Sequence, residues 1–380
     1  MQDRLAIITH EYYPVLSGGT VFAEKMAEEL GKLCWDVDIL TARIGKTFPK
    51  LEHGKGFDVR RFTTARSSVT DSTLLEHLSY FGFGLPQMMA RAARRRYSAL
   101  FNVFAIPSGL VGLAIGKALG IPSVVFVDAA DCPGVESAMR SYVRYLDPVF
   151  EFVVDRSAEV VVLEGLEDLA MPHIHHKRVV TIPNGATLPA SMARPGENGP
   201  RLELLSIGRL VLRKGFQEII EALGMVKRQR DDFRLRIVGY GRAEDDIRRE
   251  LDRHGVADNV TFLGRVEYKD LAPYFLASDA YLFYGAREGS SLAMIEAAAY
   301  GLPLIASDHP GNRTFVEEGK SGFLVEHRKP EALARAVLHL LEHRDQIAQM
   351  GRRSREIAEG YTWAKIAARY DRVLRKAMAG

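Results

Sequence analysis

Short apolar runs alternate with longer helical patterns along most of the chain. The runs are rich in Val, Ile and Leu, and the segments between them repeat apolar residues with helical spacing. Continuous apolar runs of this kind are typical of parallel strands, which are buried on both faces. The predicted strands are Leu5–Thr9, Val37–Thr41, Ala99–Val103, Ser123–Val127, Val160–Leu163, Val179–Ile182, Leu204–Ile207, Leu235–Val238, Val260–Leu263, Ala280–Phe283, Leu304–Ala306 and Phe323–Val325. The predicted helices include Ala23–Leu33, Tyr80–Ala93, Leu110–Leu119, Tyr142–Asp155, Phe216–Val226 and Trp363–Met378.

Residues 189–200 interrupt this alternation, because they are rich in Pro, Gly and polar residues and have no periodicity. We interpret them as a linker. The sequence therefore predicts an N-terminal domain of residues 1–190 and a C-terminal domain of residues 201–362, both doubly wound α/β domains. Ligands of such domains bind at the carboxyl ends of the strands, where loops converge and helix N-termini point.

Length and charge narrow the choice of function. The 380 residues suit two domains, and the hydrophobic share of 47% and the charged share of 26% are ordinary for globular proteins. A net charge of only +3, with Lys and Arg scattered, argues against a nucleic-acid partner. Cys34 and Cys132 fit neither a disulfide framework nor a zinc site, and no signal peptide precedes Leu5. We expect a cytoplasmic protein.

The segment Ala286–Pro303 carries the most information. A turn at Gly289 follows a buried strand, a helix is expected to start at about Ser290, and Gly301 is a natural stop for that helix. The backbone amides of Gly289, Ser290, Ser291 and Leu292 would be free and would lie at the positive end of the helix dipole. The segment therefore predicts a binding site for a diphosphate.

Two glutamates flank the start of this helix, Glu288 and Glu296. Glu296 has apolar neighbours, so we expect it to be largely buried and to need partners, for example the two vicinal hydroxyls of a ribose. The alternative is that Glu288 only places a negative charge at the helix start and that Glu296 is a solvated helix residue.

A second group of charges follows the strand Leu204–Ile207. Arg209, Arg213 and Lys214 precede Gly215 and the next helix. A site without a metal must take the positive charge for a leaving diphosphate from such cations and from backbone amides. The alternative is a solvated basic loop.

Glycines mark two further strand-to-helix turns. Gly18 and Gly19 follow the first strand and would permit close approach to a phosphate or a sugar, although a plain turn is an alternative. Gly239 and Gly241 flank Tyr240 after another strand, which by itself is a weak dinucleotide-like signal.

Taken with the whole block that surrounds them, Glu288 and Glu296 resemble a motif of the large glycosyltransferase family four. They have seven residues between them, and Gly301–Asp308 is similar to the usual continuation of that motif. The resemblance covers nearly the whole chain and is strongest from Leu204 to Val325. It implies the GT-B fold, in which two Rossmann-like domains face each other across a cleft.

The resemblance also implies roles for individual residues. Arg209 and Lys214 would contact the donor phosphates, whereas Arg213 has no clear assignment. Gly18 and Gly19 would contact the donor, and the Gly239 turn would lie near the nucleotide base. The final helix, with residues 363–380, would cross back to the first domain.

One position departs from the family pattern. Many relatives have a histidine followed three residues later by an aspartate, and here Asp128 replaces that histidine while Asp131 keeps its place. We count Asp131 with Glu288, Arg209 and Lys214 as a candidate catalytic residue. Asp128 and Asp131 could also bind a divalent metal, but turn capping accounts for such a pair more simply.

Two other groups of residues carry weaker signals. His173, His175 and His176 lie in a polar loop and lack a cysteine or carboxylate at ligand spacing, so we interpret them as surface histidines. The helical pattern Tyr80–Ala93 ends in the basic group Arg91, Arg94, Arg95 and Arg96. These arginines could rest on an anionic membrane or could stabilise the helix dipole.

The expected function is therefore retaining transfer of a hexose-type sugar from a nucleotide sugar to a hydroxyl of a glycan, a lipid-linked acceptor or a small molecule. A UDP-sugar is favoured and a GDP-sugar is possible, with no metal and no cofactor. No side chain stands out as a base, and in retaining relatives the donor phosphate is thought to take the acceptor proton. The alternatives are a nucleotide-sugar epimerase of the same fold and a non-catalytic nucleotide-sugar-binding protein.

Overall fold

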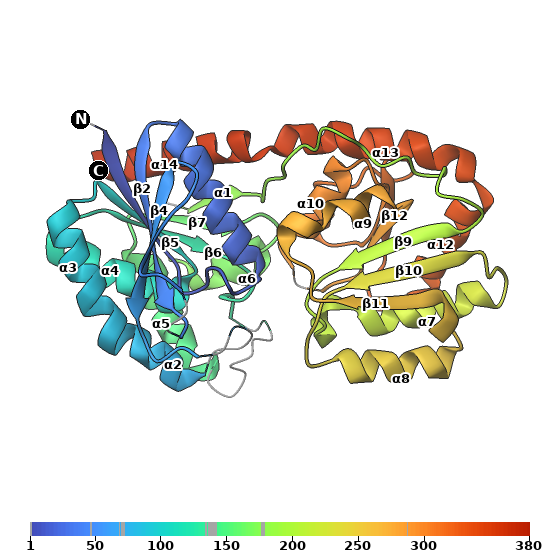
Figure 1. Cartoon of the computed structure of the whole chain (residues 1–380), viewed down its shortest axis with the longest axis horizontal. Helices are drawn as coiled ribbons and strands as arrows, with labels where there is room; N and C mark the ends of the chain where they lie inside the picture. Colours follow the sequence, from blue (N-terminus) through green and yellow to red (C-terminus); the bar gives the residue numbers. More distant parts are fainter. Residues whose placement is uncertain are drawn as a thin grey trace. The chain divides into compact units, whose positions relative to one another are not determined.

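The chain divides into two compact units (Figure 1). Its structure is a computed structural model that describes residues 2–45, 48–67, 69, 73–133, 135, 143–175, 179–286 and 288–380. The first unit consists of Met1–Pro183 and Trp363–Gly380, and the second of Asn184–Thr362. Tyr142, His176 and Arg287, which belong to segments discussed above, lie outside the described residues.

The first unit contains an eight-stranded sheet in the order β3-β4-β2-β1-β5-β6-β7-β8. Neighbouring strands are parallel except for β3 and β4, which are antiparallel. The strands are β1 Asp3–Ile8, β2 Trp35–Arg43, β3 Leu51–His53, β4 Phe57–Thr63, β5 Ala99–Val103, β6 Ser123–Val127, β7 Glu159–Leu163 and β8 Val179–Ile182. The α-helices are α1 Gly18–Lys32, α2 Leu74–Ser79, α3 Leu85–Arg95, α4 Leu110–Leu119, α5 Val143–Arg156, α6 Glu167–Ala170 and α14 Trp363–Ala379.

The second unit contains a six-stranded parallel sheet in the order β11-β10-β9-β12-β13-β14. Its strands are β9 Leu202–Ile207, β10 Phe233–Val238, β11 Val260–Gly264, β12 Ala280–Phe283, β13 Leu304–Ser307 and β14 Gly322–Val325. Its helices are α7 Phe216–Lys227, α8 Glu244–His254, α9 Ala272–Leu276, α10 Leu292–Ala299, α11 Pro310–Arg313, α12 Pro330–Glu342 and α13 Arg344–Ala358. No helix in the described part of the chain is long and apolar enough to span a membrane.

The prediction of two doubly wound α/β units is confirmed, and every expected strand is present. Strands β3 and β4 were missed. Strand β3 is exposed along its whole length, and β4 alternates buried and partly exposed residues, so neither forms a continuous apolar run. The helical pattern Tyr80–Ala93 is interrupted, because a π-helical turn, Tyr80–Gly84, joins α2 to α3.

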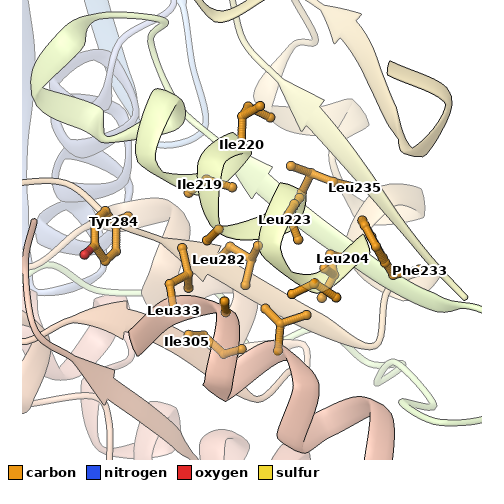
Figure 2. Packing of buried hydrophobic residues seen from close by; sticks show 14 of the residues in the cluster. Leu204, Ile219, Ile220, Leu223, Phe233, Leu235, Leu282, Tyr284, Ile305 and Leu333 are labelled. Carbon is orange, nitrogen blue, oxygen red and sulfur yellow. The ribbon is translucent and has the colours of Figure 1, made fainter. Parts of the chain in front are cut away.

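The core of the second unit shows why its strands are apolar on both faces. Leu204 packs with α7 and α12 on one face of the sheet (Figure 2), whereas its neighbour Leu205 packs with α10 on the other. Successive strand residues point to opposite faces, so a strand covered by helices on both sides buries residues on both of its faces. This burial fixes β9 at the centre of the sheet.

Helix α14 returns to the first unit and packs on it through aromatic side chains. The Phe22 and Phe126 rings stack with centroids 4.4 Å apart, and the Tyr370 ring lies 5.6 Å from that of Phe22. Trp35 Nε1 donates a hydrogen bond to Asp371 Oδ1 at 2.7 Å. These contacts tie the C-terminal helix to the first unit.

The segment that the sequence predicts as a linker is fastened to the second unit. The buried carboxylate of Asp279 accepts hydrogen bonds from the Gly196 amide and from Asn198 Nδ2, both at 2.7 Å. The Ala193 amide donates to the Tyr300 carbonyl at 2.8 Å. Within residues 189–200, these contacts replace the free coil that composition alone suggests.

Candidate functional site

Each sheet reverses its strand order at one point, and the candidate site residues follow the strands beside those points. In the second unit the reversal lies between β9 and β12, and in the first unit it lies between β1 and β5. Loops that leave such adjacent strands in opposite directions open a crevice at their carboxyl ends, which is where doubly wound sheets bind ligands.

In the second unit the structure brings Lys214 and Glu288 together across the reversal point. Lys214 Nζ lies 3.0 Å from Glu288 Oε2, and Arg213 Nη1 pairs with Glu288 Oε1. Lys214 Nζ also lies 5.3 Å from the centre of the Phe283 ring. The sequence left Arg213 unassigned, and nothing in the local pattern indicates that it pairs with a residue on another loop.

The charged groups of this cluster shift one another's pKa. Burial raises the pKa of Glu288, but Lys214 and Arg213 outweigh it and hold the pKa below its ordinary value. Burial together with the charges of Arg213 and Arg209 lowers the pKa of Lys214, which Glu288 partly offsets. The carboxylate is therefore ionised at neutral pH, and the cations around it exceed its single charge.

Arg209 is the exposed member of the group. Its side chain forms no hydrogen bond or ion pair with any described residue, although its charge affects the pKa of both Lys214 and Glu288. An exposed guanidinium beside a partly buried group of cations is available to an anionic ligand.

The turn before α10 is held by two hydrogen bonds from Asn184. Helix α10 begins at Leu292 with Ser291 as its N-cap, so the expected start near Ser290 is two residues too early. The Ser290 hydroxyl accepts a hydrogen bond from the Asn184 amide at 2.9 Å, and Asn184 Nδ2 donates to the Ser290 carbonyl at 2.7 Å. The first amides of α10 have no acceptor within the helix, which is the arrangement that binds phosphate groups.

Glu296 is buried in α10, as the sequence predicts. The Tyr268 hydroxyl donates a hydrogen bond to Glu296 Oε1, and burial and the Glu296 charge raise the pKa of Tyr268. Tyr268 was not predicted, since it lies in a short 3-10 helix, Tyr268–Asp270, whose sequence has no motif. One carboxylate oxygen of Glu296 is therefore held in place by this phenol.

The glycines after β10 are required by the packing of two loops. Gly239 has a φ of +154°, and a Cβ atom there would lie 1.9 Å from the Gly208 carbonyl oxygen. At Gly241 a Cβ atom would lie 2.4 Å from the Leu210 carbonyl oxygen. Neither position has room for a side chain, whether or not a ligand binds at Gly239.

In the first unit, Gly18 and Gly19 begin α1, with Ser17 as the N-cap. A Cβ atom on Gly19 would lie 2.4 Å from the Phe104 ring, whereas a Cβ atom on Gly18 would have no neighbour within 4 Å. Gly19 is therefore needed for packing, and Gly18 borders open space.

Asp131 is brought to the same edge of the first sheet. Its carboxylate accepts hydrogen bonds from the amides of Ala105 at 3.0 Å, Asp128 at 3.3 Å and Ile106 at 3.4 Å. Burial nevertheless raises the pKa of Asp131 to about 8. The Asp128 carboxylate accepts from the amide of Ala129 at 2.7 Å, as in a capped turn.

No cluster of three or more His, Cys, Asp or Glu residues that could hold a metal occurs among the described residues. Asp128 and Asp131 therefore lack a third ligand of that kind in the part of the chain that the structure describes. In the histidine loop, His173 Nδ1 lies 2.9 Å from Glu151 Oε1.

Sequence reasoning did not identify His10, which lies beside the reversal point in the first sheet. The His10 amide donates to the Ser108 hydroxyl at 3.0 Å, and Arg66 Nη1 donates to the His10 carbonyl at 2.5 Å. Burial and the charges of His77 and Arg66 lower the pKa of His10. Its position directly after β1 was the one available signal.

The two halves of the chain match two glycosyltransferase family models. Residues 17–185 match the glycosyl transferase 4-like domain, and residues 189–357 match glycosyl transferases group 1.

Curated relatives agree with these matches. The chain is 25% identical to a D-inositol 3-phosphate glycosyltransferase of Paenarthrobacter aurescens, over 96% of this chain and 94% of that protein. It is 34% identical to a GDP-mannose-dependent alpha-(1-6)-phosphatidylinositol monomannoside mannosyltransferase of Mycobacterium tuberculosis, over 47% of this chain and 48% of that protein. An uncharacterised glycosyltransferase of Haemophilus influenzae is 29% identical and is matched over 57% of this chain and 60% of its own length.

Solved structures share the architecture at low sequence identity. A sucrose-phosphate synthase from Thermosynechococcus elongatus aligns with a TM-score of 0.85 at 20% identity, over the whole of both chains. The Anabaena protein HepE, in complex with UDP and glucose, aligns with a TM-score of 0.77 at 16% identity, over 98% of this chain and 99% of that one. The chain has the GT-B fold and belongs to the glycosyltransferases that combine a glycosyl transferase 4-like domain with a glycosyl transferases group 1 domain.

Proposed function

We propose that the protein transfers a hexose-type sugar from a nucleoside diphosphate donor to an acceptor hydroxyl, with retention of configuration. The observation that supports this most directly is the cationic cluster of Arg209, Arg213 and Lys214 around the buried Glu288, beside the open amides of α10. Such a cluster suits a diphosphate, both as part of the donor and as the leaving group.

In the proposed reaction the bond between the sugar C1 and the diphosphate oxygen breaks, and a bond from C1 to the acceptor oxygen forms. The acceptor proton passes to the departing phosphate, which serves as the base in this proposal. Lys214 and Arg209 offset the negative charge that collects on the diphosphate, and Glu296 binds the ribose hydroxyls of the nucleotide.

Relatives support the donor class of this proposal. HepE was solved with UDP and glucose and also with UDP-glucose, and the mycobacterial relative is named as GDP-mannose-dependent. We favour a UDP-sugar and keep a GDP-sugar as the second choice. The acceptor class is a glycan, a lipid-linked sugar or a small molecule, and a cytoplasmic location remains a prediction.

A panel of nucleotide sugars tests the proposal. The protein is incubated with UDP-glucose, UDP-N-acetylglucosamine and GDP-mannose, without acceptor and with candidate acceptors, and products are followed by proton NMR. Slow release of nucleotide without acceptor, faster release with one, and a product that keeps the anomeric configuration of the donor are expected. Epimerised donor without any transfer, or tight binding without any release, would instead support the epimerase or the non-catalytic alternative.

A further inference from the structure

Large apolar side chains are exposed on one short stretch of the first unit. Leu75 is 76% exposed, Phe83 is 64% exposed and Leu78 is 54% exposed, and all three lie within nine residues on α2 and the π-helical turn that follows it. Soluble proteins rarely expose several large apolar side chains side by side, and where they do, the patch commonly marks an interaction surface.

Helix α3 extends the same surface. Pro86, Ala90 and Ala93 are exposed, whereas Met88 and Ala92 on the opposite side are buried against the sheet. Apart from Gln87 and Arg94, the exposed residues of α3 are therefore small and apolar, where a solvated helix normally carries charges of both signs. We call Leu75, Leu78, Phe83, Pro86, Ala90 and Ala93 the outer strip.

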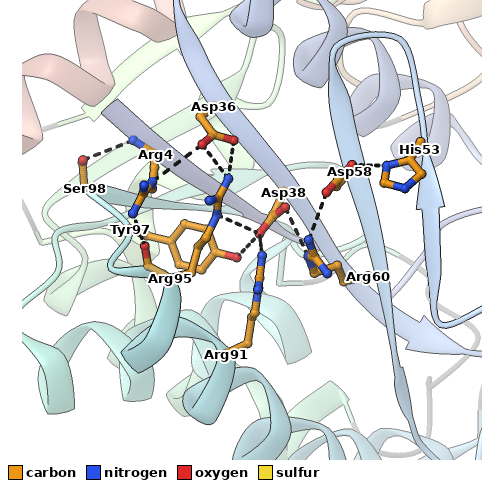
Figure 3. A network of polar contacts seen from close by, with 10 residues as sticks. All are labelled: Arg4, Asp36, Asp38, His53, Asp58, Arg60, Arg91, Arg95, Tyr97 and Ser98. Carbon is orange, nitrogen blue, oxygen red and sulfur yellow. Dashed lines mark hydrogen bonds and ion pairs between the residues drawn. The ribbon is translucent and has the colours of Figure 1, made fainter. Parts of the chain in front are cut away.

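Two of the four arginines at the end of α3 do not belong to this surface, because they are bound inside the unit (Figure 3). Arg91 Nη2 lies 2.8 Å from Asp38 Oδ2, and Arg95 Nη2 lies 2.6 Å from Asp36 Oδ1. The Tyr97 hydroxyl also donates to Asp38, which is almost fully buried. These two guanidinium groups hold α3 on β2.

The other two arginines face solvent. Arg94 and Arg96 are exposed, and their side chains form no hydrogen bond or ion pair with any described residue. Between residues 73 and 98 the sole acidic residue is Glu76. It is buried and accepts hydrogen bonds from the amides of Thr73 and Ser67, both at 2.8 Å. The outer strip therefore lies beside two exposed arginines, and within residues 73–98 there is no exposed carboxylate.

We propose that the outer strip, together with Arg94 and Arg96, docks on an anionic lipid surface. Leu75, Leu78 and Phe83 would enter the boundary between headgroups and acyl chains, and the two guanidinium groups would bind lipid phosphates. The inference concerns the first unit alone and does not depend on the transfer reaction. It bears on the proposed function because an acceptor linked to lipid would be met at this surface.

The test is flotation of the full chain with lipid vesicles. Binding to vesicles that contain phosphatidylglycerol is expected, with much weaker binding to pure phosphatidylcholine. Arg94→Gln with Arg96→Gln is expected to weaken binding about 30-fold, because each basic residue near an anionic surface contributes about fivefold. Leu75→Ser with Phe83→Ser is expected to abolish it.

A matched control carries the same loss of charge elsewhere. Arg228 and Arg352 are exposed residues of the second unit that form no side-chain hydrogen bond or ion pair with the described residues, and Arg228→Gln with Arg352→Gln should leave vesicle binding unchanged. Equal loss in this control, or full binding by Arg94→Gln with Arg96→Gln, would overturn the proposal. All variants alter exposed side chains, so thermal unfolding should match that of the original chain.

Two further measurements distinguish lipid docking from self-association and from loss of the transfer reaction. Sedimentation velocity without lipid should give the same species for the original chain and for Phe83→Ser. A dimer that Phe83→Ser dissolves would assign the strip to a second copy of the chain and would refute the lipid proposal. Release of nucleotide from the donor, measured without vesicles, should be unaffected by these variants, so failure of lipid binding and failure of the proposed function are distinguishable.

Discussion

Lys214 Nζ lies 3.0 Å from a carboxylate oxygen of Glu288, although 73 residues separate the two in the sequence. The two loops that carry them leave β9 and β12 on either side of the point where the strand order reverses. Because Arg213 binds the other oxygen of the same carboxylate, Glu288 orients two cations at once. The roles of these cations in turnover can be separated by substitution.

Lys214→Ala should lower the catalytic rate constant about a hundredfold, since one preorganised contact to developing charge typically contributes about 3 kcal/mol. The donor Michaelis constant should rise much less, because the intact donor carries less charge on the leaving oxygen. Steady-state kinetics with Lys269→Ala as control tests this, since Lys269 is exposed and pairs with Glu267. Normal turnover with weaker donor binding would show that Lys214 merely holds the substrate.

Glu296→Ala should weaken the binding of donor and of free nucleoside diphosphate alike. The lost contact is to the ribose, and hydrogen bonds to a charged group contribute about 1.5–3 kcal/mol, or about 10- to 100-fold in affinity. Tyr268→Phe keeps the carboxylate but removes its phenol donor, so it should have a smaller effect. Titration calorimetry with UDP measures both, and an unchanged affinity for Glu296→Ala rules out the ribose contact.

Substitution by alanine should affect stability at Gly19 and donor binding at Gly18. Gly19→Ala should destabilise the chain by about 1–3 kcal/mol, because its Cβ would meet the Phe104 ring. Gly18→Ala should leave thermal stability intact but raise the donor Michaelis constant, if the donor occupies the open space beside Gly18. Gly360→Ala, where a Cβ also has no neighbour within 4 Å, is the control. A donor Michaelis constant unchanged in Gly18→Ala would remove Gly18 from the donor site.

Activity should persist in the presence of a chelator. Arg209, Lys214 and the amides at the start of α10 already supply positive charge at the proposed diphosphate site. The experiment is a transfer assay in excess EDTA, with and without added magnesium or manganese. Complete loss of activity that either metal restores would favour Asp128 and Asp131 as ligands.

Asp38→Asn should destabilise the first unit by about 3–5 kcal/mol near neutral pH, because it removes the charge that binds Arg91, Arg60 and Tyr97. Burial raises the pKa of Asp38, but these partners outweigh it and lower the pKa. The stabilisation is therefore present above the unfolded value of about 3.9 and is lost as the pH falls through the lower folded value. The difference between the two chains should shrink in acid.

Urea unfolding followed by tryptophan fluorescence measures this difference. Both tryptophans of the chain, Trp35 and Trp363, lie in the first unit, so the signal reports on that unit alone. Asp58→Asn, which removes a partly exposed partner of Arg60, should have a smaller effect. If the difference in the free energy of unfolding between the two chains stays constant as the pH falls, the lowered pKa of Asp38 is contradicted.

The sequence predicts the sheets well because parallel strands covered on both faces must be continuously apolar. Leu204 and Leu205 illustrate this, since consecutive residues of β9 pack into different cores. Strands β3 and β4 escaped prediction because an edge hairpin is covered on one side at most, and Arg60 and Arg61 interrupt the apolar pattern of β4.

The candidate site was predictable where one local segment carries it, as at Glu288 and Glu296. Contacts between distant segments were not. The pairing of Arg213 with Glu288 joins two loops, and the hydrogen bond from Tyr268 to Glu296 joins residues from different elements. The anchoring of Asn198 by Asp279 is similar, since composition alone describes a flexible linker. Such pairs form only once the whole fold brings the two segments together, so a local sequence pattern does not predict them.

The chain leaves the first unit after Pro183 and returns to it at Trp363. Ala186 pairs with Thr362 in a parallel bridge, and its amide donates to the Tyr361 carbonyl at 2.9 Å, so the outgoing and returning segments lie side by side. In genetic terms the second unit is an insertion within the first. Residues 184–362 form one uninterrupted cassette that can be cloned by itself, whereas the first unit has to be spliced from two pieces of the gene, with Pro183 joined to Trp363 by a short linker.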